Sequence, residues 1–309
     1  MLFRPAHGLL FLAAVLGLSA CSTDDWPVIG KPAASFDGGS VKMADYKLRL
    51  KVLQENYRKQ TASQGEAKFP SLDSPAGRSN ETTLETESVQ DLVDAVLVQR
   101  EAQRRGINVT EDDINAQVDP FRKNYDTQAA AERAQGKSTK SFNDYLNSLG
   151  YSLDRLREEV RSRLYEQRLE DKLAQERKTA AIAALKGGQD VSAVAKQYSD
   201  DVASAGSGGT LSLHGKDLVN VASLKPTIDA LQQPGATSPD FVRADDGFYY
   251  FKLTSRDAAA DVINLQYVYV YDPKPELYST ARRPKWLIDL VGQMEKQAHV
   301  KYNVGSKAG

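Results

Sequence analysis

Two runs of strand-forming residues near the end of the chain limit the folds open to it. Val262 to Tyr271, VINLQYVYVY, is rich in β-branched and aromatic residues and gives the strongest strand signal in the sequence. Gly247 to Leu253, GFYYFKL, is a second apolar and aromatic run of strand length. Most other periodic stretches have helical spacing. We therefore expect an α+β protein.

The N-terminus indicates export. Arg4 supplies a positive charge, and Gly8 to Leu18 is an apolar run too short to span a bilayer. The run ends in Leu-Ser-Ala before Cys21, an arrangement that resembles the lipobox of bacterial lipoproteins. This resemblance implies a signal peptide over residues 1–20 and a membrane anchor through lipid on Cys21. A buried structural thiol is the alternative for this single cysteine.

The residues that follow Cys21 indicate which membrane holds the lipid anchor and where the tether lies. Ser22 and Thr23 stand where an inner-membrane retention signal would have aspartate, which favours the periplasmic face of the outer membrane. Residues 21–33 contain Pro27, Pro32 and small polar residues without periodicity. We expect this segment to be a tether.

Composition allows two domains and argues against several classes of protein. The 309 residues suffice for a leader and two domains of roughly 100 to 200 residues each. With 40 basic and 41 acidic residues there is no basic excess for nucleic acid. Three scattered histidines and one cysteine cannot assemble a typical zinc site, and no glycine-rich phosphate loop is present. We expect neither a metal nor another cofactor.

Amphipathic helices are expected over most of residues 34–176 and again near the C-terminus. Their apolar faces are formed by Tyr46, Leu50, Leu53 and Tyr57; by Val89, Leu92, Val93, Val96 and Leu97; by Ile114, Val118, Phe121 and Tyr125; by Leu153, Leu156, Val160 and Leu164; and by Trp286, Leu287, Leu290, Val291 and Met294. Thr110 and Asp113 predict a capping box. Residues 61–83, with two prolines and mixed charge, are expected to be a loop or a disordered insert.

Two helix junctions carry a resemblance to known foldases. Gly106 to Ile114 and Leu149 to Leu156, in this order after a strand and a Gly-Gly turn, resemble the N-terminal domain of SurA- and PrsA-type periplasmic foldases. In these families the last helix and strand return to complete that domain. The resemblance implies a helical chaperone domain over residues 34–176, completed by residues 283–304.

A second resemblance covers residues 177–271. Val191 to Asp201, then Gly206 to Leu211, Leu231 to Pro239 and Gly247 to Leu253, follow the order of parvulin-type peptidyl-prolyl isomerase domains. This implies an inserted parvulin-like α/β domain that acts on X-Pro bonds. Parvulins open with a strand that this chain lacks before its first helix. We expect residues 262–271 to pair with residues 248–253 and to fill the vacant central position by permutation.

The resemblance also assigns catalytic positions. Asp201 matches the cysteine-or-aspartate position of parvulins, whereas Tyr249 and, by the permuted alignment, Tyr267 stand where two histidines are usual. Tyrosine hydroxyls can form hydrogen bonds but do not titrate near neutral pH. Strand packing is the alternative role for the tyrosines. A turn is the alternative for Asp201, since aspartate is favoured in turns.

The pocket that grips proline is expected among six further residues. They are Leu213, His214, Leu218, Leu224, Ile228 and Phe248. A solvated loop is the alternative for His214.

The sequence thus predicts a lipid-anchored periplasmic foldase of the peptidyl-prolyl isomerase family. It would bind unfolded or partly folded exported polypeptides, and it has no partner among nucleic acids. The missing histidines leave its enzymatic activity open. The alternative is an inactive holdase chaperone, or an assembly factor for an envelope or polysaccharide-export system.

Overall fold

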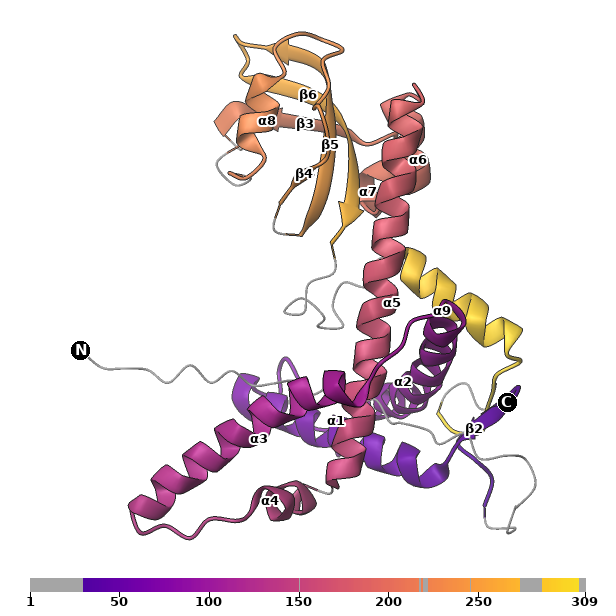
Figure 1. Cartoon of the computed structure of the whole chain (residues 1–309), viewed down its shortest axis with the longest axis vertical. Coiled ribbons are helices and arrows are strands. Elements are labelled where there is room, and N and C mark those ends of the chain that lie inside the picture. Colours follow the sequence, from indigo (N-terminus) through magenta and orange to yellow (C-terminus); the bar gives the residue numbers. More distant parts are fainter. Residues whose placement is uncertain are drawn as a thin grey trace. The chain divides into compact units, whose positions relative to one another are not determined.

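The structure of the 309-residue chain is a computed structural model with two compact units (Figure 1). It describes residues 30–149, 151–216, 218, 222–244, 246–272 and 285–305. The expected signal peptide over residues 1–20 and Cys21 lie outside these residues. Met1–Glu166 together with Val291–Gly309 form one unit, and Gln167–Leu290 form the other. We call them the helical unit and the sheet unit, and the protein is α+β as expected.

The sheet unit contains a four-stranded antiparallel sheet in the order β3-β6-β5-β4. These strands are Thr210–His214 (β3), Val242–Arg243 (β4), Gly247–Asp257 (β5) and Val262–Tyr271 (β6). β6 pairs with β5 from Tyr271 opposite Gly247 to Val262 opposite Asp257. The strand pairing expected from the sequence is therefore present, and β6 occupies a central position between β3 and β5.

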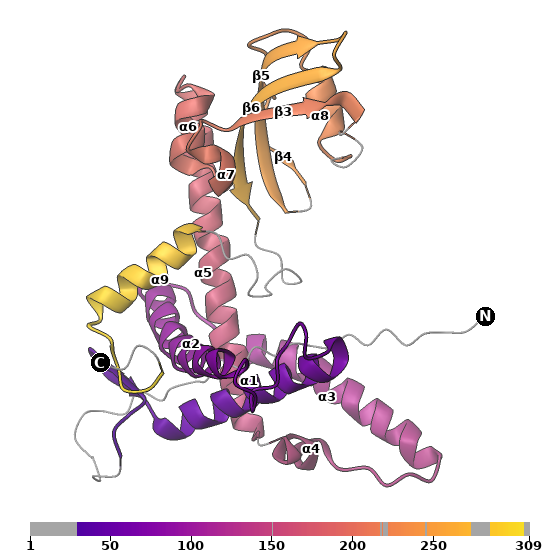
Figure 2. The same ribbon diagram turned by 180° about the vertical axis from the view of Figure 1, so that it is seen from behind.

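Helices cover both faces of this sheet. Val191–Tyr198 (α6) lies on one face and Lys225–Ala230 (α8) on the other, as Figures 1 and 2 show. The strands alternate apolar residues between the two faces, which gives two separate cores. The core beside α6 contains Ala181, Val191, Val194, Ala195, Val268 and Val270. The core beside α8 contains Leu218, Leu224, Ile228, Leu231, Phe251, Leu253, Ile263, Leu265 and Tyr267.

A three-stranded sheet joins the two ends of the described chain within the helical unit. Its order is β2-β1-β7, formed by Ala34–Phe36 (β1), Gly39–Val41 (β2) and Lys301–Tyr302 (β7). Hydrogen bonds beyond the strands extend the β1–β7 pairing: Asp37 N–H donates to the Ala298 carbonyl and Asn303 N–H to the Ala33 carbonyl, both at 2.8 Å. The C-terminal segment thus completes the N-terminal sheet.

Helices make up the rest of the helical unit. They are Met43–Gln64 (α1), Arg78–Arg104 (α2), Glu111–Ala134 (α3), Phe142–Ser148 (α4), and the parts of Leu153–Lys186 (α5) and Lys285–Gln297 (α9) that fall within it. A core of six residues connects α3, α4 and α5: Ile114, Val118, Phe142, Leu146, Leu156 and Leu164. The predicted capping box opens α3, where Thr110 Oγ1 accepts from Asp113 N–H at 3.2 Å.

Two sequence expectations about the helices were wrong in extent. α1 continues to Gln64 and α2 begins at Arg78, so the loop covers residues 65–77 rather than 61–83. The N-cap of α2 is Gly77, which has no side chain to mark a helix start. α5 continues through the expected domain boundary at residues 176 and 177, and the two units divide within it after Glu166.

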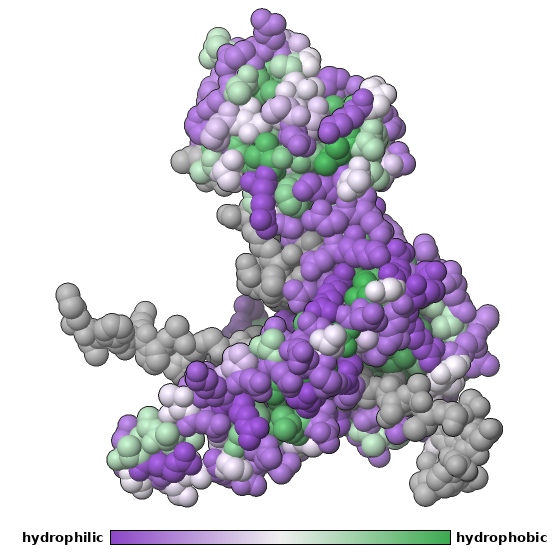
Figure 3. All heavy atoms as spheres, in the orientation of Figure 1, coloured by the Kyte–Doolittle hydropathy of each residue, from purple (hydrophilic) through white to green (hydrophobic). Residues whose placement is uncertain are grey.

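The surface is mainly hydrophilic on the face drawn in Figure 3, where apolar residues form small separate patches. Within the described residues the large apolar side chains that are most exposed are Leu149, Val202 and Ile288, at 51%, 65% and 57%. No helix in the described ranges has the length and apolar character needed to cross a membrane.

Candidate functional site

Asp201 and Tyr267, 66 positions apart in the sequence, meet in the sheet unit. Asp201 is the N-cap of the short helix α7 (Val202–Ala205), and its Oδ1 accepts from the Ala203 N–H at 3.2 Å. Tyr267 lies in the central strand β6, and its hydroxyl donates to Asp201 Oδ2. The structure therefore brings together two of the three residues that the sequence singled out as catalytic.

Ser204 is a third member of this group that the sequence analysis missed. Its hydroxyl lies 2.5 Å from Asp201 Oδ2 and 2.9 Å from the Tyr267 hydroxyl, and the residue is only 8% exposed. The available signal was the spacing Asp-x-x-Ser across the start of α7, since a residue three positions after an N-cap faces back toward it. We call Asp201, Ser204 and Tyr267 the hydroxyl–carboxylate trio.

The environment keeps the trio in fixed protonation states at neutral pH. Burial acts to raise the pKa of Asp201, but hydrogen bonds from Ser204 and Tyr267 favour the carboxylate more strongly, and the pKa is lowered overall. Burial, followed by the hydrogen bond to Asp201, raises the pKa of Tyr267 to about 12. Asp201 is thus ionised and Tyr267 neutral, so neither can exchange a proton readily near pH 7.

Tyr249 belongs to a row of aromatic side chains beside the trio. Its ring centroid lies 4.9 Å from that of Tyr269, 5.9 Å from Phe251 and 6.2 Å from Tyr267. Its hydroxyl donates to the carboxylate of Asp246, 3.1 Å from both oxygens, rather than to Asp201. Burial is the main cause of the raised pKa of Tyr249, with the Asp246 carboxylate adding to it. We call Tyr249, Phe251, Tyr267 and Tyr269 the aromatic row.

The six residues expected to form a proline pocket do not share one surface. Leu218, Leu224 and Ile228 are 2%, 5% and 1% exposed and pack in the core beneath α8, with Leu213 at its border. Phe248 precedes Tyr249 in β5 and therefore faces the opposite side of the sheet.

Contacts of Phe248 and His214 confirm that they lie away from the aromatic row. The ammonium of Lys178 lies 3.5 Å from the centroid of the Phe248 ring. His214 is exposed and stands opposite Val262, on the other face from Leu213. The expectation of one shared pocket was wrong for these two residues, because successive strand residues alternate between faces.

Comparison with known protein families assigns the N-terminal half of the chain. The model of the SurA-like N-terminal domain matches residues 7–170, which is more than half of the 309 residues. The chain belongs to the SurA-like N-terminal domain family.

Comparisons with individual proteins add little to the assignment to the SurA-like family. No curated protein matches this chain. Among solved structures, a match is found with the crystal structure of the foldase protein PrsA from Lactococcus lactis, at 12% sequence identity and a TM-score of 0.25. That match covers 88% of this chain and 95% of the PrsA chain.

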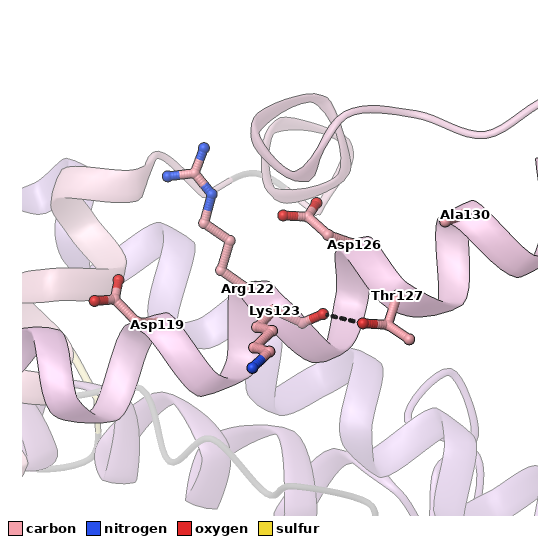
Figure 4. A pocket seen from close by; sticks show the side chains of 6 residues that line it. All are labelled: Asp119, Arg122, Lys123, Asp126, Thr127 and Ala130. Atoms are coloured by element: carbon pink, nitrogen blue, oxygen red, sulfur yellow. Dashed lines mark hydrogen bonds between the residues drawn. The ribbon is translucent and has the colours of Figure 1, made fainter.

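A shallow surface depression lies on α3 of the SurA-like domain (Figure 4). It is lined by Asp119, Arg122, Lys123, Asp126, Thr127 and Ala130, which are spaced three or four positions apart along one exposed helix face. Figure 4 shows their polar groups spread along the helix rather than directed toward a common point. The depression therefore lacks the convergent polar groups of a ligand site.

A buried ionisable cluster lies elsewhere in the SurA-like domain. Glu159 of α5 is 3% exposed, and neither of its carboxylate oxygens has a hydrogen-bond partner among the described residues. The nearest cation is Arg155, whose Nε lies 3.8 Å from Glu159 Oε1. Burial raises the pKa of Glu159 to about 8, against the opposing effects of Arg155 and Arg49. Within the described residues no cluster of side chains suits a metal ion.

Proposed function

We propose that this protein is a foldase of the cell envelope that binds unfolded or partly folded exported polypeptides. The observation that carries the proposal is the SurA-like N-terminal domain over residues 7–170. The apolar run from Gly8 to Leu18, which ends before Cys21, supports export and attachment to the periplasmic face of the outer membrane through lipid.

In this proposal the sheet unit is a parvulin-like domain in which the strand that usually begins the domain comes at the end of the domain's sequence. Support comes from the position of β6, which lies between β3 and β5 where the resemblance left a strand missing. The half-buried members of the aromatic row, Tyr249 and Tyr269, would provide the contact surface for a client chain, since aromatic side chains supply large apolar areas with little loss of conformational freedom.

Binding without catalysis is the mode that the site geometry favours. Catalysis of X-Pro rotation benefits from hydrogen-bond donors directed at the twisted amide. The Tyr267 hydroxyl and the Ser204 hydroxyl already direct their protons to Asp201. The site therefore supports the holdase alternative over isomerisation.

Isomerisation is the second candidate function, favoured by the meeting of Asp201 and Tyr267 at the two positions that the parvulin resemblance assigns to catalysis. In this reading Tyr249 and Tyr267 replace the usual histidines. Any activity would then depend on hydrogen bonding alone, because neither tyrosine titrates near neutral pH.

Two assays on the purified full chain test these candidates together. One measures suppression of aggregation of a chemically unfolded client, and the other measures proline isomerisation by a protease-coupled reaction. Suppression without acceleration supports the holdase. Acceleration that is lost in Asp201→Ala and reduced in Tyr249→Phe supports the isomerase. A protein with neither activity contradicts the foldase proposal and favours an assembly factor of an envelope or export system.

Attachment through Cys21 is tested in cells. The proposal expects incorporation of labelled palmitate into the protein and co-sedimentation with outer-membrane markers, both lost in Cys21→Ala. Labelling that persists in the variant, or sedimentation with inner-membrane markers, would contradict this part of the proposal.

A further inference from the structure

The tyrosine hydroxyls of the aromatic row all donate to acceptors within the protein. Tyr249 donates to the Asp246 carboxylate at 3.1 Å, and Tyr269 donates to the Asp246 carbonyl at 2.8 Å. Tyr267 donates to the Asp201 carboxylate. Each hydroxyl has one proton, so the groups left to a ligand are oxygen lone pairs, ring faces and carboxylates. Phe251 and Tyr267 are buried, at 1% and 9% exposed, so the part of the row open to a ligand is formed by the half-buried Tyr249 and Tyr269, which present hydrogen-bond acceptors.

The two carboxylates beside the row carry negative charge without a local counter-ion. Asp246 is exposed and Asp201 is half-buried, and within the part of the chain described neither forms an ion pair with a lysine or arginine. The low pKa of Asp201, maintained against burial by its hydrogen bonds, keeps it ionised over the physiological range. This end of the sheet therefore attracts cations.

Basic residues on the neighbouring strands are engaged elsewhere. Arg243 of β4 pairs with Asp272 at 2.8 Å, and Lys252 of β5 pairs with Asp190 at 2.8 Å. Both alternate to the face opposite Tyr249. Arg256 shares the face of the row but lies near the far end of β5, where it donates to the Ile228 carbonyl at 3.0 Å. The charge on Asp201 and Asp246 is left for a ligand.

An exposed apolar side chain follows Asp201 in the sequence. Val202 follows Asp201 at the start of α7 and is 65% exposed, the highest value among the large apolar side chains of the described residues. A ligand that fills this site therefore needs a cationic or donor-rich group for the carboxylates and rings, and an apolar group next to it.

We propose that the aromatic row and its two flanking carboxylates select client segments in which a lysine or arginine adjoins an apolar residue. This specificity rests on the proposed function as a binder of unfolded polypeptides, and it narrows the clients to basic-apolar stretches. A cation over a tyrosine ring and near a carboxylate is stabilised by both groups, whereas an acidic segment is repelled.

Binding of labelled peptides to the full chain tests the specificity. Three eight-residue peptides differ only at one position before a phenylalanine, which is Lys, Gln or Glu, and affinity is measured by fluorescence anisotropy. The lysine peptide is expected to bind about tenfold more tightly than the glutamate peptide, as two exposed charge interactions would give. The difference is expected to shrink at high salt.

A matched pair of variants locates the effect. Asp246→Asn keeps an acceptor for Tyr249 and removes one of the two charges, so the preference for lysine should fall from about tenfold to about threefold. Asp257→Asn is the control: it lies at the far end of β5, and among the described residues its side chain accepts from the Ala259 and Ala260 N–H groups alone. The control should keep the full preference.

The outcomes separate the specificity from the proposed function. Equal affinity for the three peptides, with binding retained, overturns the specificity and leaves the foldase proposal standing. Equal loss of the lysine preference in Asp246→Asn and Asp257→Asn would assign the preference to the net charge of the protein, and this outcome also overturns the specificity. A chain that binds none of the peptides and fails to suppress client aggregation contradicts both proposals.

Discussion

Replacing Glu159 by glutamine should stabilise the helical unit at neutral pH. The carboxyl group is buried among α5 residues with no hydrogen bond to either oxygen among the described residues, and its one nearby ion pair spans 3.8 Å. Burial of a charge under these conditions is costly, so the folded chain retains a proton that the unfolded chain releases. Glutamine has nearly the same shape and no proton to gain, which removes this cost.

The magnitude follows from the two pKa values. In the folded chain the pKa of Glu159 is raised to about 8, against 4.5 for the free side chain. At pH 7 the carboxyl group is protonated in the folded chain, although this pH is about 2.5 units above the pKa of the free side chain. Holding the proton lowers the free energy of unfolding by about 1.36 kcal/mol for each of these units. Glu159→Gln should therefore raise the free energy of unfolding by about 3 kcal/mol at pH 7.

The pH dependence fixes the sign of this effect. A raised folded pKa means that the folded state binds more protons than the unfolded state between pH 4.5 and about 8, so the wild-type protein loses stability as the pH rises through this window. Below pH 4.5 both states are protonated. The gain from Glu159→Gln should be near zero there, grow with pH and become constant above about pH 8.

Urea unfolding at pH 4.5, 6 and 7.5, followed by circular dichroism at 222 nm, measures the difference. The chain has two units, so two transitions are expected, and only that of the helical unit should move. Glu158→Gln is the control, because the side chain of this neighbour on α5 is 41% exposed and is paired with Arg161. A stabilisation by Glu159→Gln that is equal at the three pH values, or absent, would refute the reasoning.

Three further predictions concern the architecture. Gly209→Ala should destabilise the sheet unit by about 1 to 3 kcal/mol in urea unfolding, because Gly209 has a φ of +71° and an added Cβ would lie 2.0 Å from the Tyr267 carbonyl oxygen. A neutral effect would contradict this close approach. Arg177→Met should lower the free energy of unfolding of the same unit by about 3 to 5 kcal/mol. It removes the cation that lies 2.8 Å from the Asp200 carboxylate, a side chain that is 2% exposed. An unchanged urea midpoint at pH 7 would count against a buried pair. Thr110→Ala should lower the free energy of unfolding of the helical unit by about 1 kcal/mol by removing the side-chain cap of α3, whereas Thr110→Ser should lower it less. Equal losses in the two variants would show that the hydroxyl is not the stabilising group.

The elements that the sequence predicted well are those with a local signal. The capping box formed by Thr110 and Asp113 spans only four positions, and it marks the start of α3 correctly. The strand over Val262–Tyr271 follows from its composition. The start of α2 has no such pattern, because Gly77 at its N-cap makes no side-chain hydrogen bond, so the expected loop was too long.

The candidate site was predictable only where it depended on strand pairing. Once residues 262–271 were expected beside residues 248–253, Tyr267 became a candidate neighbour of Asp201, and the two residues meet. The pocket was harder, because its expected members came from motif order without regard to the alternation of strand faces. His214 and Phe248 point away from the aromatic row for that reason. Ser204 required the three-dimensional position of α7.

The pairing of β1 with β7 sets the order in which the fold can be completed during synthesis of the chain. Ala34 is opposite Tyr302, so the first strand has no partner on this edge until nearly the whole chain has been synthesised. The sheet unit lies between β1 and β7 in the sequence, is contiguous and can form earlier. Its folding shortens the length of flexible chain that must form a loop when β1 and β7 pair. We expect pulse-labelled hydrogen exchange during refolding to protect β5 and β6 before β1. A chain that stalls before Lys301 would therefore display an open strand edge, and so would resemble the unfinished clients of a foldase.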